Sequence, residues 1–233
     1  MASISRQFAE WVVGLKYEDL PPSVVDRAKG LTLHAFSSAL IGRDFPDTEQ
    51  ALRMMQEEEE GGGGAATVIV DGAKLTKAGA ALVNSEMMFA GGKWDTFRML
   101  THPGCAIIPS ALVSAELQKS TGRDYITGLV AGYEIMERMA ADFIPTVMSR
   151  GFHPGPVFGI FGAAMAAAKI TGLDEEQVHG TIAQCVNLAS GNVEGARSGG
   201  KSLREGGAVR NALLAVAMAR YGTPGGETVL EGE

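Results

Sequence analysis

The sequence predicts an all-α fold with one short extended segment, and three observations lead to this class. Apolar residues recur at spacings of three and four along most of the chain, as in Phe8, Trp11, Val12 and Leu15, which is the period of a helix. The chain contains 31 glycines and alanine-rich runs such as AAMAAAK, which suit helices that pack close together. Only AATVIVDG, residues 65–72, has the β-branched pattern of a strand.

Helix start signals divide the chain into segments. Pro21 and Pro22 precede the helical pattern SVVDRAKGLTLHAF, because a proline in the first turn costs no backbone hydrogen bond. Asp47 or Thr48 is expected to cap the next helix, and Asp174 is expected to cap a later one. The remaining helices are predicted over residues 76–89, 109–119, 123–148, 156–169, 174–188 and 206–221.

The segment at residues 65–72 is predicted to be β-like because its branched side chains run into an Asp-Gly turn. The tract EEEEGGGG comes just before it. We expect the four glutamates to be the solvated end of a helix, because nothing pairs with them at metal-ligand spacing. The four glycines are expected to form a surface loop within one domain that spans residues 1–233.

Composition restricts the classes of function. A formal net charge of -7 argues against general binding to nucleic acid or to an anionic membrane. Two cysteines, Cys105 and Cys185, are typical of a reducing compartment, so a cytoplasmic protein is expected. Neither cysteine belongs to a Cys/His cluster, and no metal or other cofactor is predicted.

Neither the beginning of the chain nor its apolar runs indicate a targeting or membrane segment. The N-terminus, MASISRQFAEWVVGLKYEDL, has no basic region followed by an apolar run, so it is not predicted to be a signal peptide. The longest apolar run, GPVFGIFGAAMAAAKI at residues 155–170, is shorter than the roughly 20 residues that span a bilayer. It is predicted to be a buried helix.

Three polar breaks interrupt the apolar pattern: KWDTFRMLTHPG, SRGFHPGP and ARSGGKSLREGG. The first two each contain the tripeptide His-Pro-Gly, which begins at His102 in one and at His153 in the other. A histidine before Pro-Gly is held out of helical geometry at the start of a new helix, where the dipole favours bound anions. Such a histidine suits a proton donor or a carboxylate clamp, but it can equally bond only to nearby backbone.

The other polar residues of these breaks also allow two interpretations. Lys201, with Arg204 and a helix N-terminus, would form an anion pocket, or it is a solvated loop lysine. The segment GARSGGKS matches a phosphate-binding loop only by coincidence, because no strand precedes it. Asp95 and Thr96 are candidates for a helix cap or for hydrogen bonds to a substrate.

The order and spacing of many segments resemble the MmgE/PrpD family. They include LPPSVVDRAKGLTLHAFSSALIG, ATVIVDG, KAGAALVNSEMMFA, DTFRMLTHPG, AGYEIMERM, RGFHPGPVFGIFGAA and KSLREGGAVRNALLAVAMARYG. The resemblance implies a large helical domain followed by a smaller α/β lid domain, with a metal-free pocket for di- or tricarboxylates between them. It implies functional roles for Asp95, Thr96, His102, His153 and Lys201.

The sequence departs from the family pattern at three positions. Gly92 and Trp94 stand where many members have acidic residues, and Arg204 stands where they have a histidine. Lys93 and Trp94 are expected to make the pocket more basic on one side and more apolar on the other. The chain ends at VLEGE, about where the lid would begin, so we expect a homodimer and a separate lid-bearing subunit.

The resemblance implies chemistry at a carbon next to a carboxylate: dehydration, decarboxylation or epimerisation. We expect an altered substrate and a place in a biosynthetic pathway. The expected catalytic residues are His102, His153 and Lys201. The alternatives are a cyclase that uses the pocket to fold its substrate and a non-catalytic binding or scaffold subunit. The residues expected to bind substrate are Asp95, Thr96, Lys93, Trp94 and Arg204.

Overall fold

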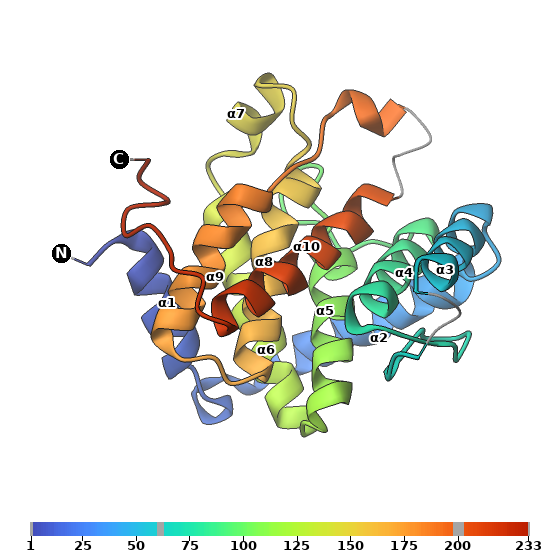
Figure 1. The fold of residues 1–233 in the computed structure, drawn as a ribbon, viewed down its shortest axis with the longest axis horizontal. Coiled ribbons are helices and arrows are strands. Elements are labelled where there is room, and N and C mark those ends of the chain that lie inside the picture. Colours follow the sequence, from blue (N-terminus) through green and yellow to red (C-terminus); the bar gives the residue numbers. More distant parts are fainter. Residues whose placement is uncertain (1, 60–62, 198–202, 233) are drawn as a thin grey trace.

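Ten α-helices and one short hairpin make up the part of the chain that the computed structural model describes, residues 2–59, 63–197 and 203–232 (Figure 1). The all-α prediction is confirmed. The helices are α1 (Ile4–Gly14), α2 (Pro22–Gly42), α3 (Pro46–Glu58), α4 (Lys77–Ala90), α5 (Pro103–Gln118), α6 (Gly122–Ala140), α7 (Ile144–Ser149), α8 (Pro154–Ile170), α9 (Glu175–Leu188) and α10 (Leu203–Arg220).

Helix α8 lies in the centre of the bundle and is buried along almost its whole length, as its apolar sequence predicts (Figure 1). It packs against α5, α6, α9 and α10. Glycines allow the close approach: a Cβ atom on Gly132 of α6 would lie 2.6 Å from the carbonyl oxygen of Gly162 on α8. Within the described residues, no helix is long and apolar enough to cross a membrane.

Helix α5 begins at Pro103, six residues before the predicted start at Pro109. Pro109 lies inside the helix, where it has no N–H for the carbonyl oxygen of Cys105, four residues earlier. The hydroxyl of Ser85 on α4 donates to that oxygen at 2.7 Å instead. The prediction was wrong because a tertiary hydrogen bond satisfies the carbonyl that the proline leaves without its helical partner.

Two other predicted boundaries were also wrong. The predicted helix over 123–148 is divided into α6 and α7, and Pro145 lies in the first turn of α7. Helix α3 begins at Pro46, so neither Asp47 nor Thr48 is its cap. The hydroxyl of Thr48 donates to the carbonyl oxygen of Gly42 at 2.8 Å and ties α3 to the end of α2.

The extended segment is shorter than the predicted 65–72. Strand β1 (Ala66–Thr67) pairs antiparallel with β2 (Lys74–Leu75), a strand that the sequence did not predict. Asn84 of α4 holds the hairpin: its Oδ1 accepts from the backbone of Ile69 at 2.8 Å, and its Nδ2 donates to the carbonyl of Thr67 at 3.0 Å. The hairpin is thereby fixed against the first part of α4.

Candidate active site

The link between α4 and α5 carries Asp95, whose carboxylate holds the start of α5. Both of its oxygens lie 3.0 Å from the backbone nitrogen of Gly104, and Oδ2 accepts a hydrogen bond of 2.5 Å from the hydroxyl of Tyr133 on α6. A carboxylate at this place satisfies an N–H that has no partner within the helix, and it interacts favourably with the helix dipole. Asp95 thus fixes the backbone beside His102.

His102 comes just before α5, and the link itself orients its ring. Nδ1 lies 3.1 Å from the backbone oxygen of Asp95 and 3.3 Å from Oγ1 of Thr96. Because a carbonyl oxygen only accepts hydrogen bonds, Nδ1 carries the proton of the neutral ring and Nε2 is the basic nitrogen. His102 is oriented to take up or deliver a proton at Nε2.

Two aromatic rings form an apolar wall beside His102. Trp94 stacks on Phe89 with ring centroids 4.9 Å apart, and its own ring lies 4.5 Å from that of His102. The indole N–H donates to the backbone oxygen of Phe89 at 2.7 Å, which locks the wall in place. Lys93 is exposed, and its backbone N–H donates to the hydroxyl of Ser38 on α2 at 3.1 Å.

His153 stands at the start of α8 and is 6% exposed. Its backbone N–H donates to the carbonyl oxygen of Gly191 at 2.8 Å, and its Nδ1 accepts from the N–H of Gly155 at 3.1 Å. The ring therefore acts as the cap of α8. Nε2 is the ring nitrogen that faces Arg204, whose Nη2 lies 3.2 Å away.

Arg204, in the first turn of α10, joins His153 to a buried carboxylate. Nε of Arg204 lies 3.4 Å from Oε1 of Glu205, and the two side chains are 11% and 1% exposed. The Nη1 atom of Arg204 is buried and has no hydrogen-bond partner among the described residues. A buried guanidinium with an unused donor is suited to bind a carboxylate oxygen.

Two buried carboxyl groups lie behind Arg204. Glu86 on α4 is 0% exposed, and its Oε1 accepts from the backbone N–H of Gly206 at 3.2 Å. Burial raises the pKa of Glu86 to about 9, so this side chain is neutral at pH 7. Burial also raises the pKa of Glu205 to about 7, against the opposing charge of Arg204. At pH 7, Glu86 and Glu205 together therefore carry less negative charge than two ionised carboxylates would.

The N-terminal ends of α5, α8 and α10 are the upper ends of these helices in Figure 1. Cys105, in the first turn of α5, is buried and feels charges from both groups of residues. The pKa of this buried thiol is raised well above its ordinary value, first by burial and then by the negative charges of Asp95, Glu205 and Glu86. Each histidine therefore stands at the positive end of a helix, which favours the binding of anions.

The structure brings the predicted site residues into two groups. Asp95, Thr96, His102 and Trp94 lie together on the α4–α5 link, whereas His153 and Arg204 meet between α8 and α10. Lys93 lies beside the first group; it is exposed, and its backbone N–H bonds to Ser38 of α2. Lys201 lies outside the described residues.

Sequence reasoning missed three residues of the site: Tyr133, Glu86 and Glu205. Glu86 was detectable as a lone charge within the apolar stretch NSEMMFA, and Glu205 as the neighbour of Arg204. Tyr133 gave no local signal, because its contact with Asp95 joins two helices. Within the described ranges, no group of three or more His, Cys, Asp or Glu side chains is placed to hold a metal ion.

The family model of the MmgE/PrpD N-terminal domain matches residues 6–233 of this chain. The cis-aconitate decarboxylase-like protein oryM of Aspergillus oryzae is 28% identical over 240 residues, which cover 98% of this chain and 49% of that protein. The cis-aconitate decarboxylases of Aspergillus terreus and Homo sapiens are each 27% identical, over 99% of this chain and 48% and 49% of those proteins. The chain spans about half the length of these relatives.

Proposed function

The chain belongs to the MmgE/PrpD family, and from this premise we propose that it is the helical domain of a lyase that decarboxylates a di- or tricarboxylate. Decarboxylation is chosen over dehydration and epimerisation because the relatives are named as cis-aconitate decarboxylases or as similar to them. The proposal rests on one observation above all: each of two histidines stands directly before a helix start, and Arg204 lies 3.2 Å from one of them, His153.

Substrate carboxylates would bind at the helix N-termini and at the guanidinium of Arg204. Backbone N–H groups at a helix start and an arginine are the donors that carboxylates accept from in proteins. The neutral state of Glu86 at pH 7 helps, because a second negative charge behind Arg204 would oppose the anion. Lys201 would add a further cation, as the family resemblance implies.

The histidines would handle the proton of the reaction. When the bond to the leaving carboxylate breaks, carbon dioxide departs and the electron pair stays on the neighbouring carbon. That carbanion takes up one proton, and a protonated Nε2 of His102 is oriented to supply it. The carboxylates that remain bound at Arg204 and the helix ends spread the transient negative charge, which the fixed donors stabilise.

We propose that the substrate differs from cis-aconitate by carrying an apolar group near His102. Trp94 and Phe89 form an apolar wall there. Gly92, just before this wall, has a φ of 70°, and a Cβ atom added to it would have no other atom within 4 Å. An alkyl substituent would contact the stacked rings, whereas a hydroxyl or a further carboxylate would find no partner on them.

An assay in D₂O tests the reaction. The chain, with and without the lid-bearing polypeptide proposed below, is incubated with cis-aconitate, and separately with an alkyl-substituted analogue, while NMR follows carbon dioxide release and deuterium incorporation. One deuterium per carbon dioxide is expected, with the alkyl compound preferred. His102→Gln should lower the rate by about 10²–10⁴-fold, as loss of a general acid does. Arg53→Gln, an exposed position on α3, is the control. Deuterium exchange without carbon dioxide release would indicate an isomerase instead.

Substrate binding can be tested without turnover. Citrate, an unreactive tricarboxylate in this assay, should raise the melting temperature of the chain, and Arg204→Gln should remove that shift. The control is Arg53→Gln, which changes an exposed arginine paired with Glu49 on α3. An equal rise in melting temperature for the wild type, Arg204→Gln and Arg53→Gln would contradict a carboxylate site at Arg204.

We further propose that the active unit contains two copies of this domain and a separate lid-bearing polypeptide. The chain spans about half the length of these relatives, and the family resemblance implies a lid domain over the pocket. Sedimentation of the purified chain should show a dimer, and full turnover should require the second polypeptide. Full activity of the isolated chain would exclude the lid-bearing partner.

A further inference from the structure

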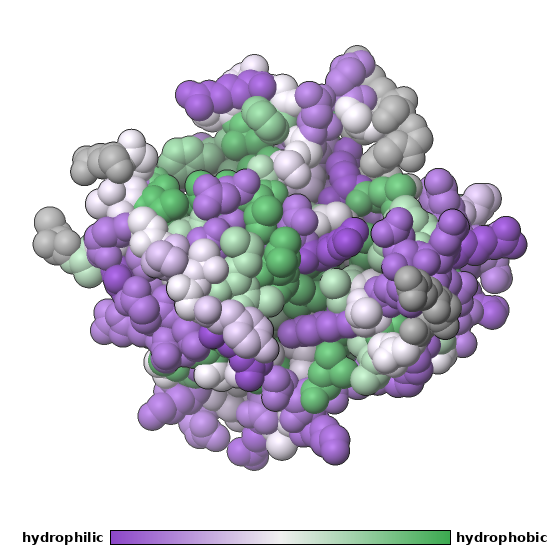
Figure 2. All heavy atoms as spheres, viewed as in Figure 1, coloured by the Kyte–Doolittle hydropathy of each residue, from purple (hydrophilic) through white to green (hydrophobic). Residues whose placement is uncertain are grey.

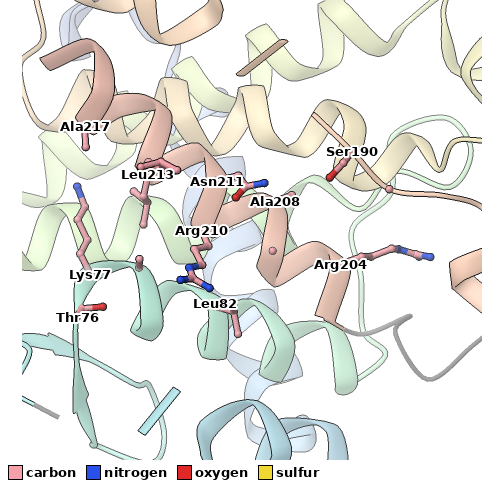
Figure 3. Close-up of a pocket in the computed structure, with 14 residues that line it drawn as sticks. Thr76, Lys77, Leu82, Ser190, Arg204, Ala208, Arg210, Asn211, Leu213 and Ala217 are labelled. Atoms are coloured by element: carbon pink, nitrogen blue, oxygen red, sulfur yellow. The ribbon is translucent and has the colours of Figure 1, made fainter. Parts of the chain in front are cut away.

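A long groove follows the outer face of α10, with one end at Arg204 and the other at Ala217 (Figure 3). Its volume is about 780 Å³. Helix α10 forms the floor, the first turns of α4 form one wall, and Ser190 and Gly191 lie on the opposite side. The stretch from Arg204 to Ala217 corresponds to about 20 Å of helix axis. A di- or tricarboxylate is much shorter and would fill only a part of it.

The middle of this groove is apolar and open. Leu82 and Leu213 lie beneath it and are only 4% and 6% exposed, whereas Leu214 is 48% exposed and presents its side chain to solvent. The space-filling view shows apolar surface in the middle of this face, with hydrophilic residues around it (Figure 2). Open apolar surface with a polar rim is typical of a site for a polypeptide partner rather than an enclosed pocket for a small molecule.

The charged residues that line the groove are all cations. Lys77, Arg204 and Arg210 contribute to the lining, and no Asp or Glu does so among the described residues. Within those residues, neither Lys77 nor Arg210 forms an ion pair. The nearby carboxylate of Glu59 accepts instead from the backbone and hydroxyl of Thr76.

This concentration of positive charge contrasts with the whole chain, whose formal net charge is -7. Burial, and then the positive charge of Arg220, lower the pKa of Lys77 to about 8. A carboxylate placed beside Lys77 would therefore relieve repulsion between cations as well as form an ion pair. The groove is electrostatically complementary to an acidic ligand.

We propose that the groove docks an acidic amphipathic helix of a second polypeptide, with apolar residues over Leu213 and Leu214 and carboxylates at Lys77 and Arg210. A helix laid along α10 covers the full length of the groove, which a short carboxylate does not. Symmetric pairing of two copies of this face would bring the same cations together, so charge argues against a second copy of this chain. The inference rests on the partner subunit proposed above, and it specifies where that subunit binds.

A designed peptide is the probe for this site. It has about 14 residues, enough to cover 20 Å as a helix, with leucines at helical spacing on one side and glutamates flanking them. Isothermal titration should show binding that weakens with salt, whereas a scrambled peptide of the same composition should not bind. Lys77→Glu/Arg210→Glu should weaken binding at least about tenfold, and a peptide with lysines in place of the glutamates should recover it.

Three outcomes would overturn the proposal. They are affinity unchanged by the charge reversal, no rescue by the lysine peptide, and displacement of the glutamate peptide by citrate from the Arg204→Gln variant, which would assign the rest of the groove to small anions. Circular dichroism and melting of the variants show whether they fold, and Lys77→Gln/Arg210→Gln is the milder replacement if the reversed variant does not. The D₂O assay is run in parallel, so failure of peptide binding is separated from failure of the proposed decarboxylation.

Discussion

Nη2 of Arg204 lies 3.2 Å from Nε2 of His153, while Nδ1 of the same ring accepts the N–H of Gly155 at 3.1 Å. Guanidinium N–H groups only donate, and a neutral histidine has one donor and one acceptor nitrogen. The two contacts therefore compete for the single lone pair of the ring. An anionic oxygen that accepts from both side chains would resolve this competition.

The first prediction concerns Arg204. Arg204→Gln removes the charge and the forked donors, so the KM for a carboxylate substrate should rise about 10–100-fold, equivalent to about 1.5–3 kcal/mol for a hydrogen bond to a charged group. Steady-state kinetics measures this change. Arg204→Lys should restore only part of the affinity, because lysine lacks the planar fork. Equal KM values for the wild type, Arg204→Gln and Arg204→Lys would show that Arg204 does not bind substrate.

The second prediction concerns the hydroxyl of Tyr133. Tyr133→Phe removes a hydrogen bond to the carboxylate of Asp95 and should lower the free energy of unfolding by about 1.5–3 kcal/mol. Tyr125→Phe is the matched control, because its hydroxyl bonds to the neutral hydroxyl of Thr32 at 2.9 Å, and it should cost about 0.5–1.5 kcal/mol. Urea denaturation of both variants measures the difference, and a larger loss in Tyr125→Phe would refute the anchoring role of Asp95.

The third prediction concerns pH. Burial raises the pKa of Glu86 to about 9, whereas an unfolded glutamate titrates near pH 4.3. The folded state therefore binds more protons between these two values, and stability falls as pH rises through that window, by at most about 1.4 kcal/mol per pH unit for one group. Glu205, with a pKa of about 7, adds the same sign of change below pH 7.

Glu86→Gln tests this dependence because glutamine keeps the acceptor for the N–H of Gly206 but cannot ionise. The plot of unfolding free energy against pH from 5 to 9 should be flatter for the variant than for the wild type. Glu58→Gln, an exposed position on α3, should leave the wild-type slope unchanged. A variant as steep as the wild type would mean that Glu86 is already ionised at pH 7.

The fourth prediction concerns helix packing. A methyl group at Gly132 would meet the carbonyl oxygen of Gly162 at 2.6 Å and Cγ2 of Ile107 at 2.7 Å. Gly132→Ala should therefore destabilise the protein by about 1–3 kcal/mol. Gly30→Ala on α2, where nothing lies within 4 Å of the added atom, should stabilise it by about 0.5–1 kcal/mol. Thermal melting of the pair is the measurement, and a shift of the same sign in both would contradict close packing between α6 and α8.

Local sequence signals predicted the helices and the placement of two site residues. His102 and His153 each stand before Pro-Gly, and each lies directly before a helix, α5 and α8. These features depend on backbone preferences within a few residues, so they can be derived from the sequence. The start of α5 was predicted incorrectly because Pro109 is tolerated inside the helix only through Ser85, a residue of another helix.

By itself, the sequence determined the helical fold, the small-residue packing of α8 and, through its ordered segments, the family. Only the tertiary structure decided that Asp95 meets Tyr133, that His153 meets Arg204 and that the carboxyl of Glu86 bonds to Gly206. These pairs are 38, 51 and 120 residues apart. Helix propensity acts over one or two turns, whereas such contacts, and the pKa shifts that burial causes, depend on how whole helices pack.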